Sequence, residues 1–409
     1  MIAVKKIIFY LFVGLVLSSF FLDPTITFAM GVVGIWIGST SNKFPVEAVK
    51  QLALPLLLLA VGLIFSFQNA PKDVFRDVFF FLNPIVIFLF GSICARYIPL
   101  IKLLRTFVYL GLVFAIIYIA NHNFSSSYDS VANFREEEGN TSYVVVVSLG
   151  ILLISIIKKL KLFRKNKTLF FIPILSAAFV IASSRTFLLV LIICVVSGLG
   201  YLRLNNKFIL RGLGLFVVLA IGVSALVSIG NTDRKTFLGK LTTSLEEITI
   251  ENKSSKQDIN SNWRGYEGYR GVLQYQKGNI YEWIFGQGFG ALTPLGITIK
   301  LGDQEFDTIP KFHNGYVHVL LKTGILGLAI YIVFFIKILL KFLKRKSDTP
   351  LGSLTINLVV AFVIIILLTT TVIAGWINQK SLTPIILTLG YLMSLNHKTN
   401  FNISTNAYA

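Results

Sequence analysis

Long apolar runs recur along the whole chain, and they decide which solvent it folds in. Runs with almost no charged residues occur from residue 7 to residue 396. A helix of about 20 apolar residues is what crosses the hydrocarbon core of a bilayer. The sequence is 55% hydrophobic and only 14% charged, which is more apolar surface than a water-soluble core buries. We therefore predict an all-α, polytopic integral membrane protein.

The apolar runs predict about twelve transmembrane helices. They lie near residues 7–22, 25–39, 52–67, 78–96, 106–120, 143–157, 168–183, 186–202, 212–229, 313–340, 353–374 and 382–396. The run at 313–340 is too long for one plain crossing. We expect Thr323-Gly324 to break it, because glycine is a usual point of interruption in a helix.

The charged residues predict the orientation. Basic residues gather in every second connection, as in Lys158-Lys159-Leu160-Lys161 and Lys344-Arg345-Lys346, whereas the alternate connections hold few. Positive charge marks the cytoplasmic side, so both termini are expected in the cytoplasm. The net charge of +19 is then a membrane-topology signal, and no nucleic-acid partner is expected. Cys94 and Cys194 lie in separate apolar runs, so neither a disulfide nor a cysteine zinc site is expected.

One connection on the outer side is much longer than the others. Residues 230–311 are too many for an ordinary loop and are predicted to form a functional extracytoplasmic subdomain. It separates an N-terminal membrane bundle of about nine helices at 1–229 from the C-terminal membrane helices and cytoplasmic tail at 312–409. The subdomain is dense in aromatic residues between 263 and 289. Such residues suit either sugar rings or the membrane interface, and composition does not separate the two.

Polar residues meet the end of this subdomain just where an apolar run begins. His313, Asn314 and His318 lie at this boundary. Burying polar groups there costs free energy, so their presence indicates a function. Asn314 could cap the helix that starts here or bind sugar. His318 follows His313 by five residues, about 500° round a helix, so the pair makes a poor metal site. We expect His318 to pack internally or to make a secondary contact.

Four motifs, taken in order, carry a resemblance. They are Ser183-Ser184-Arg185-Thr186, Asn262-Trp263-Arg264-Gly265-Tyr266-Glu267, Phe285-Gly286-Gln287-Gly288-Phe289-Gly290, and His313-Asn314-Gly315-Tyr316 followed by Gly324 and Gly327-Leu328. Their order and spacing resemble the family of O-antigen ligases and Wzy-type polysaccharide polymerases. The resemblance implies a glycosyltransferase of the GT-C type that needs no metal and no cofactor. It also implies a substrate, an undecaprenyl-diphosphate-linked oligosaccharide, and a site on the outer face of the bacterial cytoplasmic (inner) membrane.

The resemblance also implies roles for single residues. Arg185 and Arg264 match positions that bind the diphosphate, with Arg270 as a further candidate; without a metal, the leaving diphosphate needs cationic side chains. His313 matches the histidine that acts as general base or orients the substrates. Weaker substrate or sugar contacts are predicted for Arg135, Asn140, Tyr266, Glu267, Asn314, Tyr316 and His318.

Plainer roles remain open for the same residues. Arg185 could sit in a tight outer hairpin and extend to solvent, and Arg264 could be a solvated charge paired with Glu267. His313 could simply cap a helix at the membrane interface, and Arg135 and Asn140 could belong to a solvated acidic loop.

Three functions remain open. The first is a polymerase that extends O-antigen or capsular polysaccharide, with a chain-length regulator and a flippase as partners; the adjacency of His313 and Asn314, with Tyr316 following, looks more like polymerases. The second is an O-antigen ligase that moves the finished chain to lipid A-core or another acceptor. The third is a transporter or flippase, which the lack of an internal repeat and the gathering of ionisable groups at outer ends disfavour.

Overall fold

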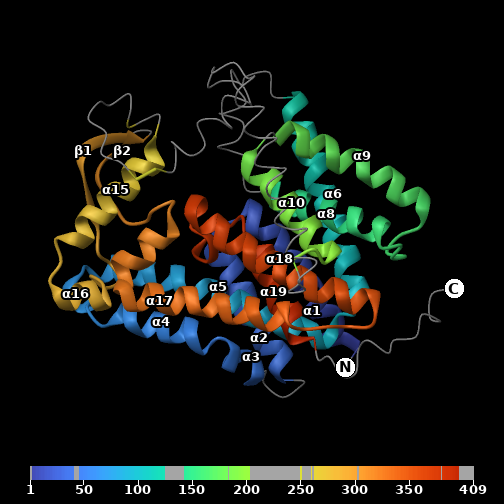
Figure 1. Ribbon diagram of the computed structural model, residues 1–409, viewed down its shortest axis with the longest axis horizontal. Coiled ribbons are helices and arrows are strands. Elements are labelled where there is room, and N and C mark those ends of the chain that lie inside the picture. The colour runs from blue at the N-terminus through green and yellow to red at the C-terminus, as the bar shows by residue number, and fades with distance from the viewer. Residues whose placement is uncertain are drawn as a thin grey trace.

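The structure is a computed structural model that describes residues 2–40, 46–124, 142–182, 184–202, 249–250, 259, 262–301, 304–378 and 380–395. Over these residues the chain is a bundle of helices with a small hairpin at one end (Figure 1). The first half contains α1 (Ile2–Phe21), α2 (Pro24–Thr40), α3 (Val46–Gln51), α4 (Ala53–Leu63), η1 (Ser66–Gln68), α5 (Pro71–Tyr97), α6 (Leu100–Phe124), α8 (Ser142–Ile157), α9 (Lys165–Ala182) and α10 (Arg185–Leu199). The second half contains α15 (Trp263–Gln276), α16 (Ile280–Phe285), β1 (Thr293–Leu301), β2 (Gln304–Ile309), α17 (Gly315–Leu343), α18 (Pro350–Ile373), η2 (Gly375–Ile377) and α19 (Thr383–Ser394).

The helices support a membrane-spanning bundle. Every predicted span falls on a helix except the one near 212–229, which lies outside the described residues. Among the described helices, six are long and apolar enough to cross a bilayer: Ile2–Phe21, Pro71–Tyr97, Leu100–Asn121, Lys165–Ala182, Gly315–Leu343 and Pro350–Ile373. The other predicted spans fall on shorter apolar helices, such as α2 and α19. A polytopic, helical membrane protein is therefore confirmed, and the number of twelve crossings stays a prediction.

Small residues let the central helices approach closely. A Cβ atom on Gly91 of α5 would lie 2.0 Å from the carbonyl oxygen of Leu387 on α19, and Ser92 Oγ donates a hydrogen bond of 3.2 Å to Gly390 O. In α10 and α18, Ser197 Oγ donates to Asn357 O at 2.7 Å, and Asn357 Nδ2 donates to Gly198 O at 3.0 Å. Within a bilayer the hydrophobic effect does not drive helices together, so close packing and interhelical hydrogen bonds stabilise their association.

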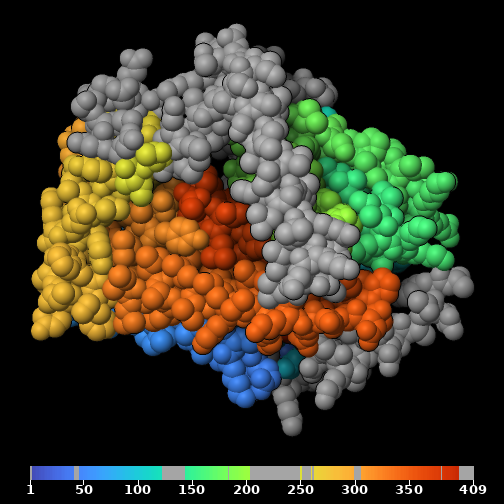
Figure 2. Space-filling view, in the orientation of Figure 1, coloured from blue at the N-terminus to red at the C-terminus, as the bar shows by residue number. Residues whose placement is uncertain are grey.

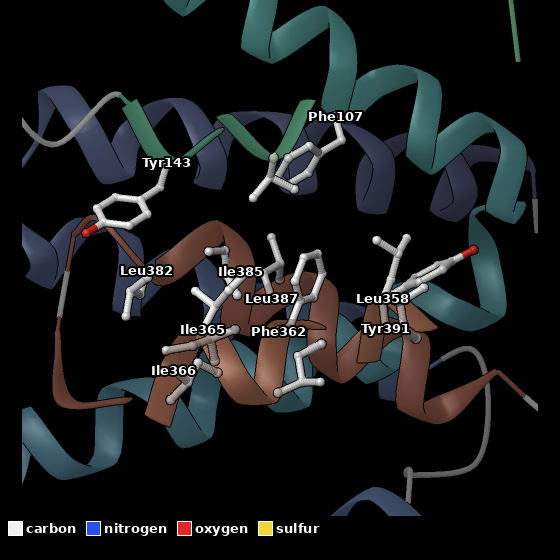
Figure 3. Close-up of a cluster of buried hydrophobic side chains, with 14 of the residues drawn as sticks. Phe107, Tyr143, Leu358, Phe362, Ile365, Ile366, Leu382, Ile385, Leu387 and Tyr391 are labelled. Atoms are coloured by element: carbon white, nitrogen blue, oxygen red, sulfur yellow. The ribbon is translucent and has the colours of Figure 1, made fainter. Parts of the chain in front are cut away.

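The centre of the bundle is a cluster of aliphatic and aromatic side chains from α18 and α19. Phe107 of α6 and Tyr143 of α8 face this cluster from the other side (Figure 3). Leu358, Phe362 and Ile365 of α18 are fully buried within it. α8 packs on α6, α9 and α10, and α10 in turn packs on α18.

The long helix α17 is interrupted at Gly324, as predicted. Gly324 has φ 64° and ψ −170°, a backbone conformation that essentially only glycine adopts. The interruption frees carbonyl groups of the preceding turn, and these accept hydrogen bonds from another segment. Gln287 N–H donates to Leu321 O at 2.8 Å, and Gly288 N–H donates to Lys322 O at 3.1 Å. The glycine-rich segment 286–290 is thus docked into the break, and its glycines serve that close contact.

A buried ion pair holds the same segment from its other side. Asp77 of α5 and Lys322 of α17 have fully buried side chains, and Lys322 Nζ lies 2.6 Å from Asp77 Oδ2. Gly290 N–H donates to the same carboxylate at 2.7 Å, and Lys322 also donates to Ala291 O. Buried charges are tolerated when they are paired and hydrogen-bonded, so this network ties α5, α17 and the glycine segment together.

The predicted extracytoplasmic subdomain contains more structure than a loop. Its described part consists of α15, α16 and an antiparallel pair, β1 and β2, with a register shift between Pro294 and Ile299. The strands were not predicted, although the alternating apolar residues of 295–301 are a strand signal in the sequence. Figure 2 shows this part gathered at one end of the molecule, beside α17. It therefore presents one compact surface next to the start of α17.

Candidate active site

His313 and Glu267 form the centre of the candidate site. Glu267 lies on α15, and His313 lies two residues before α17. The Glu267 carboxylate accepts two hydrogen bonds from the same residue: one from the His313 backbone N–H at 3.1 Å and one from Nδ1 of its ring at 2.7 Å. The Glu267 side chain is only 3% exposed, whereas that of His313 is 47% exposed. A buried carboxylate thus holds an imidazole whose other edge is accessible.

The backbone around His313 is fixed on both sides. Its carbonyl oxygen accepts a hydrogen bond of 2.6 Å from Ala374 N–H, at the end of α18. Asn314 is the N-cap of α17, and its side-chain oxygen accepts from the N–H groups of Tyr316 and Val317 at 3.1 and 3.2 Å. Asn314 therefore takes the capping role, one of its two predicted alternatives. The histidine is placed by the start of α17 and the end of α18 together.

Arg264 lies one turn before Glu267, on the same side of α15. Side chains three residues apart on a helix are neighbours, so the Arg264 side chain lies next to that of Glu267 on α15. Its charge also acts electrostatically on the phenol of Tyr143, the residue after the start of α8. The Tyr143 ring meets the Phe187 ring at 5.0 Å, edge to face. Arg264 thus lies toward the end of the bundle where α8 begins.

Arg185 is at that same end of the bundle. It is the first residue of α10, two positions before Phe187, and its side chain is partly buried. The contact of Phe187 with Tyr143 connects this end of α10 to the region of Arg264. Tyr143 thus connects the start of α10 with the start of α8, and a site shared by Arg185, Arg264 and His313 stays a prediction.

Arg270 is engaged with the hairpin. Its Nε donates to Pro294 O at 3.0 Å, and its guanidinium packs on Gly296, where a Cβ atom would lie 2.9 Å from Nη2. Tyr266 is also turned toward the hairpin, since it is 4% exposed and its hydroxyl donates to Leu295 O at 2.6 Å. Both side chains brace β1 against α15, and their predicted substrate contacts stay predictions.

His318 and Tyr316 are used inside the protein. His318 is fully buried, stacked on Phe81 at a centroid distance of 5.8 Å and edge-on to Phe312 at 6.0 Å. Internal packing is one of the two roles expected for His318. The Tyr316 hydroxyl donates to Leu367 O at 2.8 Å and so connects α17 to α18.

Lys311 is a cation of this region that the sequence analysis missed. Its Nζ lies 4.8 Å from the centroid of the Phe80 ring. Burial lowers the pKa of Lys311 to about 8, and the negative charges of Asp77 and Glu267 oppose that shift. Its one signal in the sequence is position, since it stands two residues before His313. Glu267 itself had been predicted only as a weak substrate contact or a partner of Arg264, whereas its carboxylate binds His313.

The remaining predicted residues have other fates. Arg135 and Asn140 lie outside the described residues.

Some aromatic residues of the subdomain are internal, such as Phe289 at 0% exposure, and others are at the surface. The exposed ones are concentrated on α16, where Tyr281 is 64% and Trp283 43% exposed, and α16 packs on α17 beside Gly324. Across the part of the chain that the structure describes, no group of three or more His, Cys, Asp or Glu side chains could hold a metal ion.

Comparison with known proteins gives one result. Residues 169–332 match a family model described as O-antigen ligase. The matched segment runs from α9 into α17, and it includes Arg185, Arg264, Glu267 and His313. No curated protein and no solved structure matches the chain.

Proposed function

We propose that this chain, whose residues 169–332 match a family model described as O-antigen ligase, belongs to the family of O-antigen ligases and Wzy-type polymerases and is a polysaccharide polymerase. It joins undecaprenyl-diphosphate-linked oligosaccharide repeat units into O-antigen or capsular polysaccharide. A sugar hydroxyl of one unit attacks the anomeric carbon of another, and the lipid diphosphate is the leaving group. At the level of the family, the match supports glycosyl transfer of this kind; polymerisation is the finer proposal.

The observation that carries the proposal is the contact between Glu267 and His313, with Arg264 one turn away. A partly exposed imidazole held by a buried carboxylate suits a group that must meet a hydroxyl in one orientation. A guanidinium on the same face suits the two oxygens of a departing phosphate, which it can bind bidentately. We assign Arg185, the first residue of α10, as a second cation for that charge.

A ligase is the second candidate, because the matching family model is described as O-antigen ligase. The polymerase is favoured by the order of His313, Asn314 and Tyr316, and both functions would use the same donor and the same site. Deletion of the gene followed by gel electrophoresis of surface polysaccharide separates them. Single repeat units on the surface lipid would support the polymerase, whereas long chains accumulating on the carrier lipid would support the ligase.

The same proposal includes the setting of the enzyme. The fold is of the GT-C type with twelve crossings in the cytoplasmic (inner) membrane, both termini are cytoplasmic, and the site faces the periplasmic or extracellular side. Residues 230–311 form the extracytoplasmic subdomain between the membrane parts 1–229 and 312–409. A flippase that delivers repeat units and a regulator of chain length are the proposed partners. Exposed Tyr281 and Trp283 on α16, beside a spanning helix, favour the membrane interface over sugar binding for these two aromatic residues.

Arg264→Lys should reduce polymer formation strongly although the charge is kept. Lysine is a point charge on a flexible stem and cannot form the two parallel hydrogen bonds that a guanidinium offers to a phosphate. We expect turnover to fall by about 10-fold or more, from the loss of about 1.5 kcal/mol or more of charge-assisted bonding. Polymer per unit of membrane-inserted protein measures this. Lys277→Arg, at the exposed end of the same helix, is the matched control and should leave the ladder unchanged.

Removal of divalent metals should leave the purified enzyme active. The proposed stabilisation of the diphosphate comes from Arg185 and Arg264, and cationic side chains can replace a metal in that role. We expect turnover of lipid-linked oligosaccharide in EDTA to stay within about twofold of the untreated enzyme. Complete loss in EDTA, restored by added Mg²⁺ or Mn²⁺, would contradict the metal-free mechanism.

A further inference from the structure

Glu267 does more to His313 than a structural hydrogen bond would. Its two oxygens accept from two different groups of one residue, the backbone N–H at 3.1 Å and ring Nδ1 at 2.7 Å. The backbone bond alone would be enough to place residue 313. The second bond fixes the ring, and the bond from Ala374 N–H to His313 O fixes the peptide on its other side. Position and ring orientation are therefore both determined.

The chemistry of the carboxylate decides where the ring carries its proton. An ionised carboxylate has no hydrogen to donate, so the Nδ1 atom that it contacts must carry one. The neutral imidazole then holds its lone pair at Nε2. Nδ1 faces the buried Glu267, whereas the side chain of His313 is 47% exposed. The accessible edge of the ring is therefore its proton-accepting edge.

We propose that Glu267 is the positioning residue that holds His313 as the Nδ1–H tautomer and so makes Nε2 the general base of the transfer. This inference rests on the proposed function. The hydroxyl oxygen of the attacking sugar forms a bond to the anomeric carbon as its proton moves to Nε2. The bond from that carbon to the diphosphate oxygen breaks, and its electron pair leaves with the lipid diphosphate. The imidazolium that results lies beside the Glu267 carboxylate, and it returns its proton to water.

Glutamine separates this role from a purely structural one. Glu267→Gln keeps the shape of the side chain but offers one oxygen to two donors. If that oxygen keeps the backbone N–H of His313, the amide NH₂ faces Nδ1 and favours the opposite tautomer, with the proton on Nε2. The ring would then present a donor to the sugar hydroxyl. We expect kcat to fall about 100-fold with KM changed less than about twofold, because binding is kept and proton transfer is lost.

The experiment uses the full-length protein reconstituted in lipid vesicles. The substrate is lipid-linked oligosaccharide extracted from cells that lack the gene. Glu282→Gln is the matched control, since it removes a carboxylate from the same subdomain and glutamine can serve in its capping box on α16. We expect the control to keep wild-type kcat and KM. Spectra of ¹⁵N-histidine-labelled protein should show His313 protonated at Nδ1 in the wild type and in the control, and not in Glu267→Gln.

The outcomes distinguish a failure of the proposed role of Glu267 from a failure of the proposed function. An inactive His313→Asn enzyme with a Glu267→Gln enzyme of wild-type kcat would overturn the role of Glu267 and leave the proposed function standing. Wild-type turnover in both variants would remove His313 from the mechanism and the site with it. A loss in Glu267→Gln that follows only a lower melting temperature, with the wild-type ¹⁵N pattern retained, would assign Glu267 a structural role and also overturn the inference.

Discussion

Replacement of His313 by alanine should abolish polymer formation while the protein still inserts in the membrane. A general base contributes about 10²- to 10⁴-fold to the rate, and His313 donates to the Glu267 carboxylate from both its backbone N–H and its ring. Ladders of surface polysaccharide, normalised to the amount of inserted protein, measure the effect. We expect single repeat units in place of the ladder.

Alanine also leaves the buried Glu267 carboxylate without its ring partner, which costs stability of about 1–3 kcal/mol. His313→Asn separates the loss of the base from the loss of stability. The asparagine NH₂ can still donate to the Glu267 carboxylate, but asparagine has no nitrogen that accepts a proton. Gln276→Ala, at an exposed position of α15, controls for substitution in the subdomain. A normal chain-length ladder from His313→Asn would refute the site.

The parts of the fold that could be predicted are those that depend only on residues close together in the sequence. Apolar runs gave the positions of the helices, because the bilayer requires a run of fixed length whatever the neighbours are. A glycine inside the longest run predicted the break at Gly324. The helical offset from His313 left internal packing or a secondary contact for His318, and the structure shows that side chain buried. None of these depends on which segments meet.

The parts that could not be predicted are the meetings of distant segments. Glu267 contacts His313 across 46 residues, and nothing in the local sequence selects that pair over Arg264 and Glu267. In the sequence, Lys322 is a cation within an apolar run. Only the packed structure shows that its partner is Asp77 of α5. The glycines at 286, 288 and 290 resembled a family motif, but their positive φ and their docking into α17 follow only from the packed structure.

Gly324→Ala should lower the stability of the folded protein by about 3 kcal/mol or more. Its φ of 64° and ψ of −170° are strained for any residue with a side chain. An added Cβ atom would also lie 2.3 Å from Ile284 O and 2.5 Å from Gly286 N, both of them backbone atoms that cannot rotate away. The change therefore pushes the glycine segment out of the break. The melting temperature of the detergent-purified protein, followed by size-exclusion chromatography, measures the loss.

Gly268→Ala is the matched control on α15. It lies within a helix, where alanine is preferred to glycine, and its Cβ atom would meet the side chain of Ile250 at ordinary contact distances, 3.4 Å to Cγ1 and 3.8 Å to Cδ1. Its melting temperature should equal or exceed that of the wild type. The two classes of variant then have opposite signatures: His313→Asn keeps the folded protein and loses turnover, whereas Gly324→Ala loses the folded protein. A Gly324→Ala protein that melts like the wild type would mean that α17 can close its break, and that docking of segment 286–290 does not need it.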